Sequence, residues 1–175
     1  MTDAASAPGR DRAPGLARRM ACFVYEGMLL FGLGLIPGAL GAIHMAASGH
    51  NPTPASNTVL RLFTLAAFGS YFVWFWSRRG QTLPMQTWHI RVVGPDGAPP
   101  RPARALARFA AACLWFAPAS LLAALSGWTR WQGLAAVGAG IVAWALLALL
   151  HPQRQFWHDA IAGTRLLAAQ PPRRP

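Results

Sequence analysis

Four long runs of apolar residues alternate with short polar segments along the chain. A bilayer core of about 30 Å requires about 20 consecutive apolar residues in helical form. Stretches of that length cover about residues 20–43, 59–77, 105–126 and 131–150. The pattern therefore predicts an all-α membrane protein with four transmembrane helices.

Small and helix-breaking residues punctuate the first run. Gly34, Pro37 and Gly38 lie in its second half, and proline removes a backbone donor. We expect the first span to be broken toward its far end. The spacing of Gly34 and Gly38 also favours close contact with another helix.

The polar segment between the second and third runs is richer than the other connections. It reads "HIRVVGPDGAPPRP", with adjacent β-branched residues at 92 and 93 and an Asp-Gly pair at 96 and 97. β-Branched residues favour extended backbone, and Asp-Gly favours a tight turn. The segment predicts a short extended piece or hairpin. We expect residues 1–15 to form a disordered tail, 16–168 a transmembrane domain and 169–175 a second tail.

Composition supports a membrane location and sets an orientation. The chain has 175 residues, of which 54% are hydrophobic and 12% charged, and its net charge is +11. All 16 basic residues are arginine, and all except Arg61 and Arg130 flank the same side of the four runs. Arginines that flank apolar runs argue against a nucleic-acid partner. The positive-inside rule predicts that both termini and the long middle loop are cytoplasmic.

Tryptophans occur at both ends of the predicted spans. Trp74 and Trp76 close the second span, and Trp128 and Trp131 lie between the third and fourth. Tryptophan is enriched at membrane–water interfaces, so we expect these residues to form interfacial belts.

Charged residues within or beside the spans are the candidates for function. An ionisable group at the depth of Glu26 costs several kcal/mol unless a partner or water compensates it. Arg19 lies two turns earlier on the same face, about 10 Å away along the axis. Asp159, Arg108 and Arg79 fall on the same predicted side of the membrane. We expect these five residues to cluster, either as a structural ion-pair clasp or as a cation or proton site.

His158 and Asp159 are adjacent, but neighbours on a helix point about 100° apart. We therefore do not expect them to form a dyad with each other. His151 can share a face with His158, yet no recognised metal-ligand spacing is present. No Ser or Cys lies in a nucleophile motif. The sequence predicts no catalytic centre, metal or cofactor.

Three segments together resemble the RDD family of small bacterial membrane proteins. They are "RMACFVYE", "GQTLPMQTWHIRVVGPDG" and "WHDAIAGTRLL", and the resemblance covers about residues 15–168. Glu26 stands where the family usually has Asp, and Pro84 where a Gly is common. The positions that match family motifs, with one neighbouring arginine, are Arg19, Glu26, Arg79, Gly80, Thr82, Arg108, His158, Asp159 and Thr164.

The resemblance implies a protein of the bacterial inner membrane whose "WHDAIAGT" segment returns to the cytoplasmic interface. Four spans barely enclose an aqueous path, and only one acidic residue lies within a span. We therefore expect a non-catalytic accessory, assembly or scaffold role, in a homo-oligomer or a larger membrane complex. The alternative, which some family members suggest, is an Na⁺(K⁺)/H⁺ antiporter that uses Glu26 as its intramembrane carboxylate.

Overall fold

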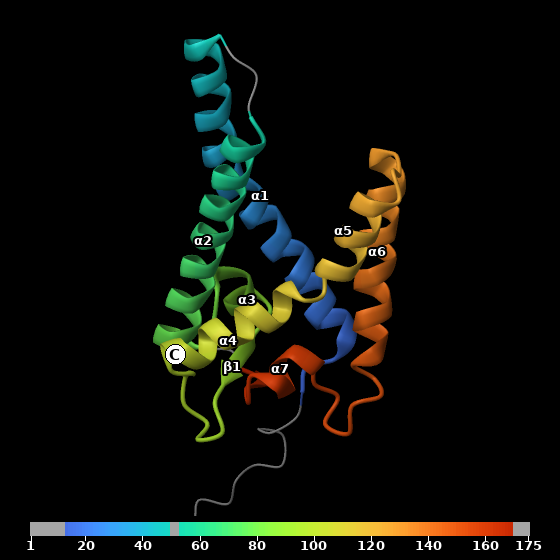
Figure 1. Cartoon of the computed structure of the whole chain (residues 1–175). Coiled ribbons are helices and arrows are strands. Elements are labelled where there is room, and N and C mark those ends of the chain that lie inside the picture. The colour runs from blue at the N-terminus through green and yellow to red at the C-terminus, as the bar shows by residue number, and fades with distance from the viewer. Residues whose placement is uncertain (1–12, 50–52, 170–175) are drawn as a thin grey trace, which may run out of the picture.

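The computed structural model describes residues 13–49 and 53–169. Helices dominate it, and four of the described helical stretches are long and apolar enough to cross a membrane. Figure 1 shows two helical hairpins that diverge from a common base. The short helices and the strands lie at this base, together with both ends of the described chain. We call it the arginine-bearing end, because it carries Arg78, Arg79, Arg91, Arg101, Arg104, Arg108 and Arg165.

The first two spans form one hairpin. Helix α1 covers Leu16–Ser48 and α2 covers Pro54–Arg79. At about 1.5 Å per residue, the 33 residues of α1 extend about 50 Å. The helix therefore exceeds a bilayer core of about 30 Å, and it begins and ends beyond the predicted limits of 20 and 43.

The predicted break in α1 is wrong, because the helix continues through Pro37. A single proline removes one intrahelical hydrogen bond, and transmembrane helices tolerate this loss. Two glycines near Pro37, Gly34 and Gly41, pack against α2. A Cβ at Gly34 would lie 3.7 Å from the Phe68 ring, and one at Gly41 would lie 3.1 Å from Leu60, whereas Gly38 has no such neighbour.

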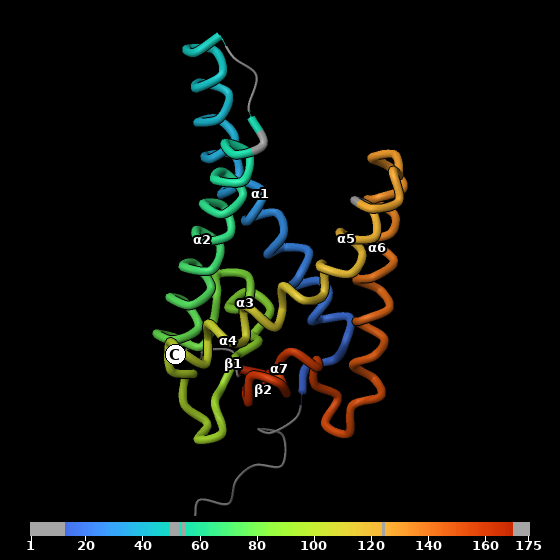
Figure 2. Tube along the Cα trace, viewed as in Figure 1, coloured from blue at the N-terminus to red at the C-terminus, as the bar shows by residue number. Residues whose placement is uncertain are grey.

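The third candidate span, Pro102–Ala123, is interrupted. It consists of α4 (Pro102–Cys113) and α5 (Ala117–Leu125). The turn between them has short-range bonds, such as Phe116 N to Cys113 O at 3.2 Å. Pro118 explains the interruption, because its ring has no N–H and would clash with the carbonyl of Leu114. As a result, α4 runs obliquely across the base before α5 rises (Figure 2).

The second hairpin consists of α5 and α6 (Arg130–Leu147). Small residues bring its helices together. A Cβ at Gly133 would lie 3.4 Å from that of Ala123, and one at Gly140 would lie 3.7 Å from that of Ala119. Thr129 and Gln132 form a capping box at the start of α6. The hairpin is therefore held internally by close backbone approach.

The middle loop forms α3 (Leu83–Thr87) and β1 (Ile90–Val93), and the C-terminal segment forms α7 (Trp157–Ile161) and β2 (Arg165–Ala168). The extended piece is present, but the predicted local hairpin is not formed. Strand β1 pairs antiparallel with β2, with Ile90 opposite Ala168 and Val93 opposite Arg165.

A turn at 94–97 does form, with Gly97 at φ 75° and its N–H bonded to the Gly94 carbonyl. The segment that follows contains Pro99, Pro100 and Pro102, which have no amide donors for a second strand.

Both outer edges of the two-stranded sheet are bonded within the chain. Gln81 Nε2 donates to the Ile90 carbonyl at 2.7 Å on the β1 side. On the β2 side, the Gln155 amide group donates to the Leu166 carbonyl at 3.0 Å and accepts from its N–H at 2.9 Å. These contacts leave no open strand edge at those positions for another chain.

The apolar core lies at the arginine-bearing end and not between the spans. Val92 and Ile90 are almost fully buried there. Trp76 also belongs to this core with 4% exposure, so its prediction as an interfacial residue was wrong, whereas Trp74 is exposed. Other members of the core are Cys22, Met85, Ala105, Ala148, Phe156 and Leu166.

Candidate functional site

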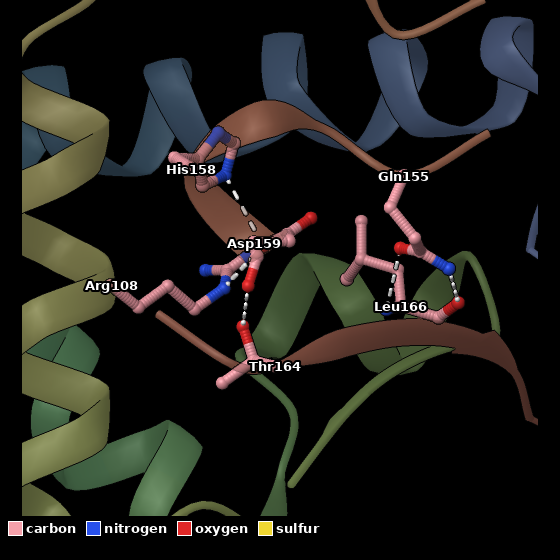
Figure 3. A network of polar contacts seen from close by, with 6 residues as sticks. All are labelled: Arg108, Gln155, His158, Asp159, Thr164 and Leu166. Carbon is pink, nitrogen blue, oxygen red and sulfur yellow. Dashed lines mark hydrogen bonds and ion pairs between the residues drawn. The ribbon is translucent and has the colours of Figure 1, made fainter. Parts of the chain in front are cut away.

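A buried ion pair joins α4 to α7. Arg108 Nε donates to Asp159 Oδ1 at 2.7 Å, and the two side chains are 6% and 0% exposed (Figure 3). The guanidinium of Arg108 also lies over the Trp76 ring, 4.0 Å from its centroid. A charge-assisted bond in this position compensates two charges that would otherwise be costly to bury.

Thr164 fixes the backbone that carries Asp159. Its N–H donates to the Asp159 carbonyl at 2.8 Å, and its hydroxyl donates to the same oxygen at 3.2 Å. Gly163, with φ 63°, precedes it and turns the chain from α7 toward β2. The "HDAIAGT" segment is thereby closed into a compact turn, which holds the carboxylate toward α4.

His158 touches the same carboxylate, contrary to our expectation for adjacent helical residues. Its Nε2 lies 3.3 Å from Asp159 Oδ1. The Cα–Cβ bonds of adjacent helical residues point about 100° apart. The imidazole of His158 is nevertheless long enough to reach the carboxylate of Asp159. Its ring stacks on Phe156 and meets Trp115 edge-on. The pKa of His158 is lowered to about 4, chiefly by burial; Asp159 opposes this shift, and Arg108 and Arg19 add to it.

Glu26 is held by a different group. Thr82 Oγ1 donates to Glu26 Oε2 at 2.6 Å, and both residues are buried. Thr82 also caps α3, because its hydroxyl accepts from the Met85 N–H at 3.4 Å. The Tyr71 hydroxyl borders this carboxylate but lacks a well-aligned hydrogen bond. The carboxylate of α1 is thus tied to the middle loop.

Gly80 makes this arrangement sterically feasible. It ends α2 with φ 68°, and a Cβ at this position would lie 2.6 Å from the Val92 carbonyl oxygen. The Val92 N–H in turn bonds to the Gly80 carbonyl at 2.7 Å. A side chain at position 80 would push β1 away and displace Thr82.

Arg19 forms no ion pair with Glu26 or Asp159, although it lies in the same buried region. It is 4% exposed, and its guanidinium lies 4.4 Å from the centroid of the Phe156 ring. No nitrogen of Arg19 lies within 4.0 Å of a carboxylate in the described part of the chain. Its Nε and Nη1 have no hydrogen-bond partner among the described residues.

Arg79 is exposed at the end of α2 and makes no ion pair with a described residue. In the predicted set, both carboxylates are therefore hydrogen-bonded, and both Arg19 and Arg108 lie over aromatic rings, whereas Arg79 lies outside the cluster. We call the buried set the polar layer; its members are Arg19, Glu26, Thr82, Arg108, His158 and Asp159.

Several residues contribute to the site although the sequence did not single them out for it. Trp76 and Phe156 supply the rings beneath the two buried arginines. Arg18 donates to the carbonyls of Trp88 and His89 and so ties the start of α1 to the middle loop. Gln155 could have been noted in the sequence, because it is a polar but uncharged residue beside the aromatic Phe156, in a motif close to the predicted membrane surface.

The polar layer joins α1, α3, α4 and α7. Its formal charges balance, because it contains two arginines and two carboxylates while His158 is neutral. Glu26 Oε1 and Asp159 Oδ2 have no partner among the described residues. Chemically, such a layer can hold elements together, and its two free carboxylate oxygens can accept a proton, a water or a cation. Within the described ranges, no three His, Cys, Asp or Glu side chains gather as a metal site would require.

Comparison with known proteins gives one match. The model of the RDD family matches residues 13–163, which include the whole polar layer. No curated protein and no solved structure matches the chain.

Proposed function

The chain belongs to the RDD family, and from this premise we propose that it has a non-catalytic accessory or assembly role within a bacterial cytoplasmic membrane. Family membership and four apolar helices point to a multi-pass membrane protein. The role itself is inferred from how the helices pack.

The observation that supports an assembly role is the small share of each span that is buried within the protein. In the most apolar 18-residue stretch of each candidate span, the buried share is 6% in α1, α2 and α6, and 17% in the third span. Membrane helices associate through close packing, not through exclusion of water. Spans that contact each other so little leave most of their surface for lipid or for other transmembrane helices.

The polar layer supports the same role. It concentrates the buried polar contacts at one end, where they tie the C-terminal segment to α4 and the middle loop to α1. Such a clasp fixes the base while the two hairpins diverge above it (Figure 1). We infer that the base acts as a rigid mount and that the hairpins present membrane-embedded surfaces to a second copy or to another protein.

For orientation, we propose that the arginine-bearing end faces the cytoplasm. Near the start of α1, Arg18 donates to the carbonyl of His89, directly before β1, and β2 pairs with β1. Both ends of the described chain therefore lie at this end, which favours an even number of membrane crossings. The positive-inside rule then favours the cytoplasm for this end.

Site-specific photo-crosslinking in native membranes tests the role. A crosslinking residue replaces Phe31 on α1 or Trp131 on α6, whose side chains are 72% and 80% exposed. We expect discrete protein adducts from at least one of these positions. The control position is Ala98, which is exposed in the middle loop. Adducts to lipid alone from both hairpins would contradict an assembly role.

A second candidate function is Na⁺(K⁺)/H⁺ antiport. The observation that favours it is the pair of unpartnered oxygens on Glu26 and Asp159. Dye quenching after a pH jump in proteoliposomes tests it, with wild type compared to Glu26→Gln. Cation-dependent proton movement that disappears in the variant would support transport. The absence of such movement in folded wild type would reject it.

A further inference from the structure

An apolar groove runs between α2 and α4 on the outside of the molecule. Its volume is about 570 Å³. Ser70 is the only side chain with a polar group among the lining residues. The two helices approach closely at Gly69, where a Cβ would lie 3.1 Å from the Phe109 ring. Other residues that line the groove include Leu62, Leu65, Ala66 and Leu106.

The groove follows α2, which is one of the described helices long and apolar enough to cross a membrane. Its lining on this helix extends from Val73, near the arginine-bearing end, to Leu62. At 1.5 Å per residue this interval spans about 16 Å. Half of a bilayer core of about 30 Å is about 15 Å. The groove therefore has the length of one leaflet's hydrocarbon layer.

Positive charge lies at the end of the groove where headgroups would be. Pro102 and Ala103, in the first turn of α4, line the groove, and Arg101 directly precedes them. That first turn contains no acidic residue. Arg101 is exposed and has no ion-pair partner among the described side chains. Arg104, by contrast, is turned toward Gly94 and Gly163, beside the Asp96 carboxylate.

The wider charge balance points the same way. The described residues include three carboxylates, of which Glu26 and Asp159 are buried and Asp96 alone is exposed. Many exposed arginines share this end of the molecule, among them Arg78, Arg79, Arg101 and Arg154. Their field attracts anionic headgroups, at about 1 kcal/mol per arginine near the surface.

We propose that the groove between α2 and α4 binds one anionic phospholipid, with an acyl chain between the helices and the phosphate at Arg101. The length of the groove, its apolar lining and the unpaired charge at one end match the two halves of such a lipid. A neutral transmembrane helix of another chain would use the apolar lining but not the charge.

The test uses the full chain in mild detergent and native mass spectrometry. Phosphatidylglycerol and phosphatidylcholine of the same chain length are titrated separately, and the bound fraction is measured. We expect phosphatidylglycerol to bind at least about fivefold more tightly. Arg101→Gln should abolish this preference, whereas Arg154→Gln, an exposed arginine at the same end, should retain it.

A second pair of variants tests the apolar part. Ala103→Phe and Leu62→Trp place bulk at opposite ends of the groove and should weaken binding of both lipids. Two variants at separate sites keep the test valid if one of them fails to fold.

Three outcomes would overturn the proposal. In the first, wild type binds the two lipids with equal affinity. In the second, Arg101→Gln and Arg154→Gln lose the preference for phosphatidylglycerol to the same extent. In the third, the protein forms a dimer without lipid, and Ala103→Phe disrupts this dimer. The last would assign the groove to a second copy.

Discussion

Arg108 on α4 and Asp159 on α7 form a buried ion pair 2.7 Å long, 51 residues apart in the chain. The ion pair connects the interrupted third span to the segment that returns after the fourth, beside the ring contact of Trp115 with His158. Because each side chain is almost fully buried, the loss of one partner leaves the other charge without compensation. The base of the molecule should therefore be sensitive to substitution of either residue.

Neutralising Asp159 should destabilise the protein strongly. Asp159→Asn preserves shape but removes the charge opposite Arg108, and we expect the free energy of unfolding to fall by about 3–5 kcal/mol. Thermal or denaturant unfolding in detergent measures it. The matched control is Asp96→Asn, an exposed aspartate, which should change stability by no more than about 0.5 kcal/mol. A double variant, Arg108→Met with Asp159→Leu, removes both charges and should recover part of the loss; a double variant no more stable than Asp159→Asn would argue against unpaired charge as the cause.

His158 should make stability depend on pH between about 4 and 6.5. In the folded protein the pKa of His158 is lowered to about 4, with burial as the largest cause. In the unfolded chain its pKa is about 6.5. In that window the unfolded state binds the extra proton, so stability rises with pH. We expect acidification from pH 7 to pH 4 to remove up to about 3 kcal/mol through this residue.

Unfolding measured over this range in wild type and His158→Gln isolates the contribution, because carboxylates titrate in both proteins. The two curves should converge as the pH falls toward 4. Parallel curves would mean that His158 does not titrate as described.

Gly80 should not tolerate a side chain. In Gly80→Ala the new Cβ meets the Val92 carbonyl oxygen at 2.6 Å in addition to the unfavourable φ of 68°. Gly97→Ala is the matched control, since Gly97 also has positive φ, 75°, but open space around it. The control should lose about 1–2 kcal/mol from conformation alone. Gly80→Ala should lower the free energy of unfolding by at least about 1 kcal/mol more than the control, because of overpacking. Equal losses in the two variants would show that β1 moves away without an energetic cost.

Thr82 should act through its hydroxyl. Thr82→Val keeps the shape but removes the donor to Glu26 Oε2 and the cap of α3. A buried acceptor left without its donor costs about 1–3 kcal/mol, and unfolding experiments should show a loss of this size. Thr82→Ser retains the hydroxyl and should lose less than the valine variant. If both variants lose the same amount, the threonine methyl group and not the hydrogen bond explains the effect.

Local features of the sequence were sufficient for the membrane architecture. Whether a stretch can cross a bilayer depends on its own length and apolarity, so the four spans could be predicted from composition along the chain. The motif residues could be named as well, because the family resemblance rests on short segments around Arg19, Gly80 and Asp159. Extended backbone at Val92 and Val93 followed from their β-branched side chains.

Partner choice depended on tertiary structure. The sequence offered several arginines for each carboxylate, and only packing placed Arg108 on Asp159 and left Arg79 outside. Pro37 and Pro118 both lie within long apolar runs, yet α1 continues through Pro37, whereas the third span is interrupted just before Pro118. Strand β1 pairs with β2, which begins 75 residues later. A local hairpin is not formed because the prolines after the turn lack the amide donors that it needs. Burial and pairing are properties of contacts between distant segments, and no local pattern fixes which of several compatible contacts the folded chain makes.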